Sequence, residues 1–202
     1  MYGYAASVIK TSNLEHDIAQ SLENIGWENI VRGDSTVFIK PNFTYPYYKE
    51  GITTNPKVLQ ILLEILKDRC DRVIVGESDG GNRSYSADEG FKGHGMFGIC
   101  KETGAELVNL SSVPSVYVEE RIQNKKVKVQ LPELLLNDID CFISVPVLKV
   151  HVMTTITLSI KNLWGCYPDT MRSLHHKHLS QKLALITKTV NPQIALIDGT
   201  YA

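Results

Sequence analysis

The chain has 202 residues, enough for one domain with a sizeable hydrophobic core, and its 43% hydrophobic and 21% charged residues are typical of a globular protein. The formal net charge of -1 and the lack of a long basic run argue against nucleic acid as a partner. No segment approaches the ~20 apolar residues of a membrane-spanning helix, and residues 1–10 lack a signal-peptide pattern. We therefore expect a cytoplasmic protein with no membrane partner.

The first half of the chain alternates apolar runs with helical patterns. Asn13 and Asn55 are placed to cap helices, and Pro56 suits a first helical turn. Spacing and caps predict an edge strand at residues 7–10, a helix over 14–25, a strand over 36–40, a helix from 56 to about 68 and a strand over 72–76.

The second half begins with a capping-box pattern from Ser86 to Glu89, and Gly93 and Gly95 predict a break in that helix near His94. Two segments with alternating polarity flank Gln123 and Asn124 and predict a solvent-facing hairpin. The further predictions are strands over 106–109, 141–145 and 194–197, and helices over 132–137, from about 154 to 163 and from about 176 to 190.

This alternation predicts a single α/β domain over residues 1–202, with a mostly parallel, doubly wound sheet and a small antiparallel hairpin insertion. The chain ends at Ala202 just after a strand and turn, so we expect the domain to continue beyond it. The four cysteines, which include Cys141 in a buried strand, form no Cys-x-x-Cys pair for zinc or an iron–sulfur cluster. The oligomeric state stays open.

Polar segments follow four of the predicted strands. In doubly wound sheets, ligands bind beyond the carboxyl ends of the strands. That rule predicts a shared crevice, whose contributing segments are Lys40-Pro-Asn42, Glu77-Ser-Asp-Gly-Gly81, Lys149-Val-His151 and Asp198.

One wall of this crevice is the segment of residues 149–165. Lys149 and His151 lie two residues apart and so point to the same side of an extended chain. Hydroxyl residues and the start of the predicted helix suit an anion, and Lys161 and Asn162 could fold back over it. The alternative is that the lysines are solvated and the hydroxyls only cap the helix.

Two other clusters have open assignments. Glu77 and Asp79 could bind a cation or act as acid and base, or could simply belong to a tight turn. Among the histidines of residues 175–178, His176 and His178 are candidate ligands for a divalent metal together with His151, the alternative being a solvated helix start. No nucleotide-binding fingerprint and no Gly-x-Ser-x-Gly elbow is present.

The motifs above resemble the successive blocks of the domain of unknown function 362 family. The blocks are Lys40-Pro-Asn42, Thr53-Thr-Asn-Pro56, Val75-Gly-Glu77, Lys149-Val-His151, Leu158-Ser-Ile-Lys-Asn-Leu-Trp-Gly165 and Leu196-Ile-Asp-Gly199. The resemblance implies a chain that continues past the Asp-Gly turn. Many members also carry a ferredoxin-like module with two four-cysteine runs; this sequence has none, so no iron–sulfur cluster is expected.

A fainter resemblance is to the N-terminal domain of the nickel-pincer lactate racemase family. It implies a role for His151, a cofactor-holding role for Lys161 and nickel ligation by His176 or His178. The lysine block of that family is replaced here by Leu158-Ser-Ile-Lys161, and the Glu77–Gly81 loop lacks the histidine of a two-base racemisation. A shared scaffold is therefore expected, but not a shared reaction.

These observations predict a protein that binds a small anionic ligand or a metallocofactor at the strand ends. Lys161, His151 and Asp79 are the candidate catalytic residues. Candidate ligand-binding residues are Lys40, Asn42, Glu77, Lys149 and Asn162. The sequence leaves open whether the protein is an enzyme; the alternative is a non-catalytic metal or cofactor carrier, or a scaffold for a redox partner.

Overall fold

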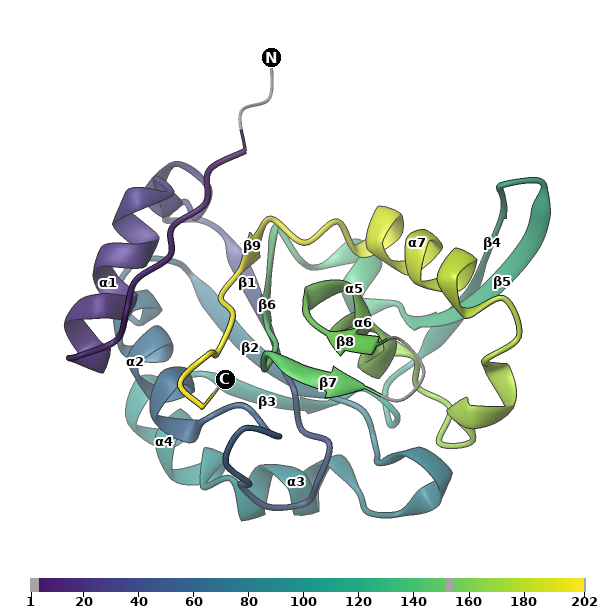
Figure 1. The fold of residues 1–202 in the computed structure, drawn as a ribbon, viewed down its shortest axis with the longest axis horizontal. Helices are drawn as coiled ribbons and strands as arrows, with labels where there is room; N and C mark the ends of the chain where they lie inside the picture. Colours follow the sequence, from purple (N-terminus) through teal and green to yellow (C-terminus); the bar gives the residue numbers. More distant parts are fainter. Residues whose placement is uncertain (1–3, 152–154, 202) are drawn as a thin grey trace.

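The computed structural model describes residues 4–151 and 155–201. Its centre is a parallel five-stranded sheet with the strand order β3-β2-β1-β6-β9 (Figure 1). The strands are β1 (Thr36–Pro41), β2 (Arg72–Glu77), β3 (Glu106–Asn109), β6 (Cys141–Val145) and β9 (Ile194–Ala195). The predicted α/β class with a mostly parallel sheet is confirmed.

Helices cover both faces of the sheet (Figure 1). Residues of α1 (Leu14–Asn24), α2 (Pro56–Leu66), α3 (Ala87–Gly93) and α4 (Met96–Thr103) share one hydrophobic core. Residues of α5 (Leu134–Asn137) and α7 (Leu179–Val190) share a second core. The described residues also form four 3₁₀ helices: η1 (Trp27–Asn29), η2 (Gly81–Arg83), η3 (Leu163–Cys166) and η4 (Arg172–His175).

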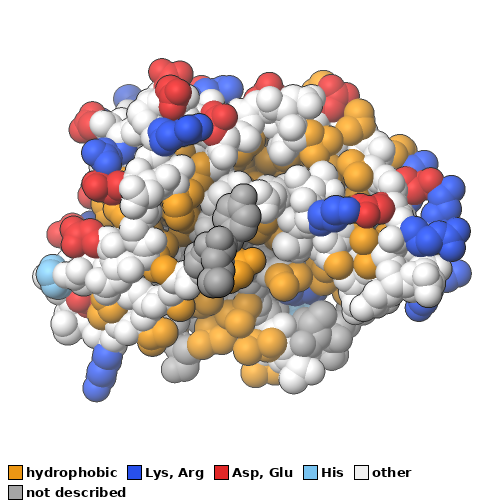
Figure 2. Space-filling model, turned by 90° about the horizontal axis from the view of Figure 1, so that it is seen from above, with side chains coloured by type: hydrophobic (Ala, Val, Ile, Leu, Met, Phe, Trp, Pro, Cys, Tyr) orange, Lys and Arg blue, Asp and Glu red, His pale blue; other side chains and the backbone are white. Residues whose placement is uncertain are grey.

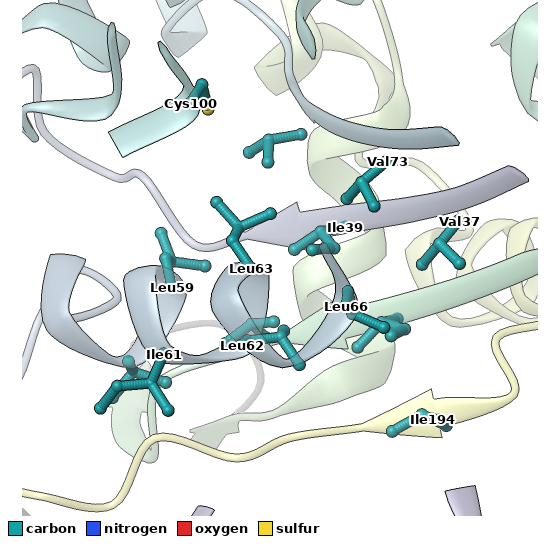
Figure 3. Close-up of a cluster of buried hydrophobic side chains, with 14 of the residues drawn as sticks. Val37, Ile39, Leu59, Ile61, Leu62, Leu63, Leu66, Val73, Cys100 and Ile194 are labelled. Atoms are coloured by element: carbon teal, nitrogen blue, oxygen red, sulfur yellow. The ribbon is translucent and has the colours of Figure 1, made fainter. Parts of the chain in front are cut away.

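Side chains of the central strand β1 pack alternately into the two cores. Successive side chains of a strand point to opposite faces. Val37 and Ile39 accordingly face α2, where Leu63 and Leu66 lie over them (Figure 3), while Phe38 packs in the second core. A continuous apolar run is therefore what a strand covered on both faces requires.

The helix caps of the first half confirm the capping predictions. The side chains of Asn13 and Asn55 accept hydrogen bonds from the backbone N–H groups of the first turns of α1 and α2. Ser86 forms the predicted capping box with Glu89. The predicted break near His94 is also present, because Gly95 adopts a φ of 71° between α3 and α4.

Two strand predictions need correction, whereas the predicted antiparallel hairpin is confirmed. Residues 7–10 form no strand, and the last strand, predicted over 194–197, is only the two-residue β9. The hairpin β4 (Ser115–Ile122) and β5 (Lys125–Pro132) turns at Gln123 and Asn124, which have φ angles of 49° and 63°. As the alternating polarity predicts, one face of the hairpin is exposed to solvent, while Val127, Val129 and Leu131 on the other face are buried in the second core.

The predicted helix over residues 154–163 is wrong over residues 155–158. Its expected start, Thr154, lies outside the described residues; β8 (Thr155–Thr157) instead pairs antiparallel with β7 (Lys149–His151). The β-branched residues of β8 favour extended chain, and the helix α6 is only Ser159–Asn162. The helix expected from residue 176 likewise begins later, at Leu179, because His178 adopts a left-handed φ of 58°.

Candidate anion-binding site

A cavity of about 190 Å³ lies beyond the carboxyl ends of β1 and β2 and is also lined by β7, in the segment that follows β6. The chain leaves β1 toward β2 on one side, while β6 lies on its other side, so the strand order reverses at this point. Ligands of doubly wound sheets bind at such a reversal. The charged groups and the imidazole that line the cavity are Lys40, Glu77, Lys149, His151, Lys161 and Arg172.

A buried ion pair forms part of the cavity wall. Lys40 Nζ lies 2.6 Å from Glu77 Oε2, and the lysine is 1% exposed. Lys40 also donates to the Pro41 carbonyl at 2.7 Å, while Glu77 accepts hydrogen bonds from the backbone N–H groups of Phe43 and Ser78. A charge pair this well surrounded by hydrogen bonds is neutral as a unit and suits a structural role.

Gly165 of η3 packs directly on this pair. A Cβ atom at this position would lie 2.8 Å from Glu77 Oε1 and 2.8 Å from Lys40 Nζ. The Gly165 carbonyl also accepts a 2.6 Å hydrogen bond from Ser78 Oγ. The close approach of η3 to β1 and β2 therefore depends on the missing side chain.

Three further cations line the cavity: Lys149, Lys161 and Arg172. Lys149 Nζ donates to Thr44 Oγ1 at 2.9 Å and to the Ile52 carbonyl.

The guanidinium of Arg172 donates to Ser78 Oγ at 2.6 Å and to the carbonyls of Tyr167 and Asp79. Neutral oxygens accept all of these hydrogen bonds. Within residues 4–151 and 155–201, no carboxylate forms an ion pair with Lys149, Lys161 or Arg172.

The pKa values of these groups report the positive potential of the cavity. Burial and the nearby Lys161 lower the pKa of Lys149 to about 8, although Glu77 acts in the opposite direction. Burial, followed by Arg172, lowers the pKa of Lys161. Burial, followed by Lys161 and Lys149, lowers the pKa of His151, so its imidazole is neutral at pH 7.

Buried polar atoms without a partner gather at the same cavity. They are Asn42 Oδ1, Thr157 Oγ1, Asn162 Oδ1 and Trp164 Nε1, all from residues that line it. Buried polar groups nearly always have a hydrogen-bond partner; these four atoms have none among the described residues, so they can bond to water or to a ligand. The Asn162 amide is oriented by its Nδ2, which donates to the Lys40 carbonyl at 3.0 Å and to Ser144 Oγ at 3.2 Å.

The structure thus brings together seven of the ten residues predicted for the site: Lys40, Asn42, Glu77, Lys149, His151, Lys161 and Asn162. Sequence reasoning missed Arg172 and Trp164. Both lie in or beside 3₁₀ helices, where no apolar period or strand end marks a position as special.

Asp79 does not line the cavity. Its Oδ1 accepts hydrogen bonds from the Ala87 N–H at 2.8 Å and from Asn109 Nδ2 at 2.9 Å, which holds the start of α3. Asp198 is similar, since its carboxylate accepts from the Asn55 N–H at the start of α2. The predicted acid–base placement of Asp79 is therefore corrected to a structural one.

The histidines after η3 are not among the residues that line the cavity, although His176 lies beside Trp164, which does. His175 pairs with Asp169 at 2.8 Å, the ring of His176 lies 5.7 Å from that of Trp164, and His178 precedes α7. No three His, Cys, Asp or Glu residues gather as metal ligands in the part of the chain that the structure describes. Metal binding by His176 and His178 stays a prediction.

A second, more open cavity of about 500 Å³ lies between the β4–β5 hairpin and the start of α7. Lysine and arginine side chains gather at this end of the molecule (Figure 2). Four lysines line it: Lys126, Lys128, Lys177 and Lys182.

The fold resembles that of a crystal structure of a protein from Thermotoga maritima, with a TM-score of 0.51 at 11% sequence identity; the match covers 97% of this chain and 52% of that one. A thylakoid-associated protein of Synechocystis sp. is 22% identical over 193 residues, 88% of this chain and 55% of that protein. The chain therefore spans about half the length of these relatives.

No helix among the described residues is long and apolar enough to cross a membrane. The expected cytoplasmic location stays a prediction, and the fainter resemblance to the lactate racemase family is not confirmed by these matches. The model of the family described as a domain of unknown function (DUF362) matches residues 37–202, and the chain belongs to that family.

Proposed function

We propose that this domain binds a small anion, carrying a carboxylate or phosphate group, in the cavity beyond the ends of β1 and β2. The observation that carries the proposal is the unbalanced charge of the cavity. Lys149, Lys161 and Arg172 face it without a carboxylate partner among the described residues, and its one carboxylate, Glu77, is already neutralised by Lys40.

Like charges held together in a partly buried site repel one another, and an anion relieves that repulsion. At ~4 Å and an effective dielectric constant of about 20, each cation–anion pair gains roughly 4 kcal/mol before the cost of desolvation. The pKa of Lys149 is lowered first by burial and then by the charge of Lys161. Binding of an anion should raise that pKa again.

The unpaired polar atoms suggest what else the ligand carries. Asn42 Oδ1 and Asn162 Oδ1 are acceptors, so they favour a ligand with a hydroxyl group or another donor beside its acid group. Trp164 Nε1 is a donor and favours a second acceptor. The neutral imidazole of His151 supplies a proton acceptor for an enzymatic role.

Isothermal titration calorimetry with inorganic phosphate and with oxamate tests the proposal. We expect binding that weakens with added salt, and a loss of about tenfold to a hundredfold in Lys161→Gln, because a charge-assisted hydrogen bond contributes roughly 1.5–3 kcal/mol. Lys101→Gln, at an exposed position of α4, is the matched control and should bind as the wild type does. Equal affinity in Lys161→Gln, or no binding of either anion, would overturn the proposal.

Exchange of ligand hydrogen for deuterium would distinguish an enzyme from a non-catalytic carrier. An enzyme that uses His151 as a base exchanges a carbon-bound hydrogen of its ligand for deuterium in heavy water, and His151→Gln abolishes the exchange. Binding of the ligand without exchange in the wild type would favour the non-catalytic carrier.

A further inference from the structure

Lys161 differs from the other two cations in how it is held. Lys149 and Arg172 both donate to fixed protein oxygens that orient them. Within the described residues, no hydrogen bond or ion pair joins Lys161 Nζ to another group. An oriented cation is suited to holding an anion, whereas an amine without a partner keeps its lone pair available once it loses its proton.

The surroundings of Lys161 favour that loss of a proton. The residue ends the short helix α6 and lines the cavity with Arg172 and Lys149. Burial and the Arg172 charge lower its pKa, so a larger fraction of Lys161 is the neutral amine near pH 7 than for a lysine in water. Enzymes activate nucleophilic lysines through burial and a neighbouring cation.

We propose that Lys161 forms an imine with a small 2-oxo carboxylate held in this cavity. The inference rests on the proposed anion site and specifies its ligand: the carboxylate is bound by the oriented cations Lys149 and Arg172, and the adjacent carbonyl carbon meets the unpaired amine. A volume of about 190 Å³ suits an acid of only a few carbon atoms.

The chemistry balances without a further reactant. The lone pair of Lys161 Nζ attacks the carbonyl carbon, and the carbonyl oxygen becomes a hydroxyl as the nitrogen gives up a proton. The second proton of the nitrogen then passes to the hydroxyl, the C–O bond breaks and the oxygen leaves as water, while the nitrogen lone pair forms the C=N bond. One amine and one carbonyl thus give one imine and one water.

Two neighbouring groups suit these steps. The neutral imidazole of His151 can take the proton that the nitrogen releases and return it to the departing hydroxyl. The unpaired Asn162 Oδ1 is an acceptor for the hydroxyl of the intermediate, at a position fixed by the hydrogen bonds of the Asn162 Nδ2 group.

Reductive trapping tests the inference. The protein is incubated with pyruvate and cyanoborohydride, which reduces an imine to a stable secondary amine, and is then digested for mass spectrometry. We expect one modified residue, Lys161, with a mass gain equal to that of pyruvic acid less one oxygen atom. Lys161→Arg keeps the positive charge but cannot form the imine, so its adduct should be absent. Lys101→Arg, at an exposed position, should be modified at Lys161 as the wild type is.

Oxamate separates failure of the imine from failure of the anion site. It has the shape and charge of pyruvate, but its amide carbonyl does not form an imine. Binding of oxamate and pyruvate with no adduct, or with adducts spread over surface lysines equally in Lys161→Arg, would overturn the imine and leave the anion site standing. Absence of binding by both compounds would overturn both. Peptide mapping of the wild-type adduct decides the matter even where Lys161→Arg folds poorly.

Discussion

Replacement of Gly165 by alanine tests the packing of η3 on the buried ion pair. The new Cβ would lie 2.8 Å from both Glu77 Oε1 and Lys40 Nζ, closer than real Cβ contacts come. Neither atom can move aside freely, because Lys40 is 1% exposed and Glu77 is held by two backbone N–H groups. Overpacking of this kind costs about 1–3 kcal/mol, and the cost rises toward about 3–5 kcal/mol where a buried ion pair separates.

Backbone preference alone predicts the opposite result, that Gly165→Ala stabilises the protein. Gly165 does not occupy the left-handed region, so alanine is conformationally allowed there. At a compatible position, a change from glycine to alanine stabilises a protein by about 0.4–1 kcal/mol. Gly98 of α4 is the matched control, since a Cβ there meets no atom within 4 Å.

Urea unfolding followed by circular dichroism measures both variants. With a typical slope of ~2 kcal/mol/M, Gly165→Ala should lower the unfolding midpoint by roughly 0.5–1.5 M, while Gly98→Ala should raise it slightly. A Gly165→Ala protein as stable as the wild type would refute the reasoning that η3 packs tightly on Lys40 and Glu77. The slope should stay unchanged in both variants.

Three further outcomes follow from the buried groups. Lys40→Met leaves the Glu77 carboxylate buried without its cation and should lower the free energy of unfolding in urea by about 3–5 kcal/mol. The double variant Lys40→Met/Glu77→Leu should lose less stability. Equal losses in the two variants would contradict the pairing. Oxamate affinity, measured by calorimetry across pH, should fall above about pH 8 as Lys149 loses its proton, and Lys149→Arg should reduce this fall. Burial lowers the pKa of His94, so as pH falls the unfolded chain takes up a proton at this residue before the native protein does. The free energy of unfolding should therefore drop as pH falls below about 6.5. Thermal unfolding across pH should show a smaller drop in His94→Phe.

The placement of Lys40, Glu77 and Lys149 could be predicted from the sequence because strand ends are simple to locate. Each residue follows an apolar run, and parallel strands bring their carboxyl ends to one edge of the sheet. The roles of these residues could not be predicted in the same way. Lys40 was expected to bind the ligand, but it pairs with Glu77, 37 positions away in the sequence, and no local pattern encodes that contact.

The lack of a local sequence pattern for long-range contacts also explains why the role of Asp79 and the position of Arg172 could not be predicted. A polar residue in a strand-end loop is equally suited to a cavity and to a helix start, and only the position of α3 decides for Asp79. Arg172 enters the cavity through hydrogen bonds to Ser78 and to the Asp79 carbonyl, on a loop more than 90 residues earlier. Long-range backbone acceptors of this kind have no signature in composition or spacing.

In the segment of residues 149–165, Lys161 lines the cavity as predicted even though the predicted secondary structure is partly wrong. The long helix expected there would have fixed Lys161 by its period; the four-residue α6 is too short to do so by itself. Its position depends instead on the next residue, Asn162, whose amide binds the Lys40 carbonyl on β1 and Ser144 on β6. Lys161 is thereby tied to β1, whose end lines the cavity, and to the neighbouring strand β6. Asn162→Ala should consequently impair trapping of pyruvate on Lys161 even though the amine itself is intact, and an unchanged trapping rate would show that α6 is positioned by other contacts.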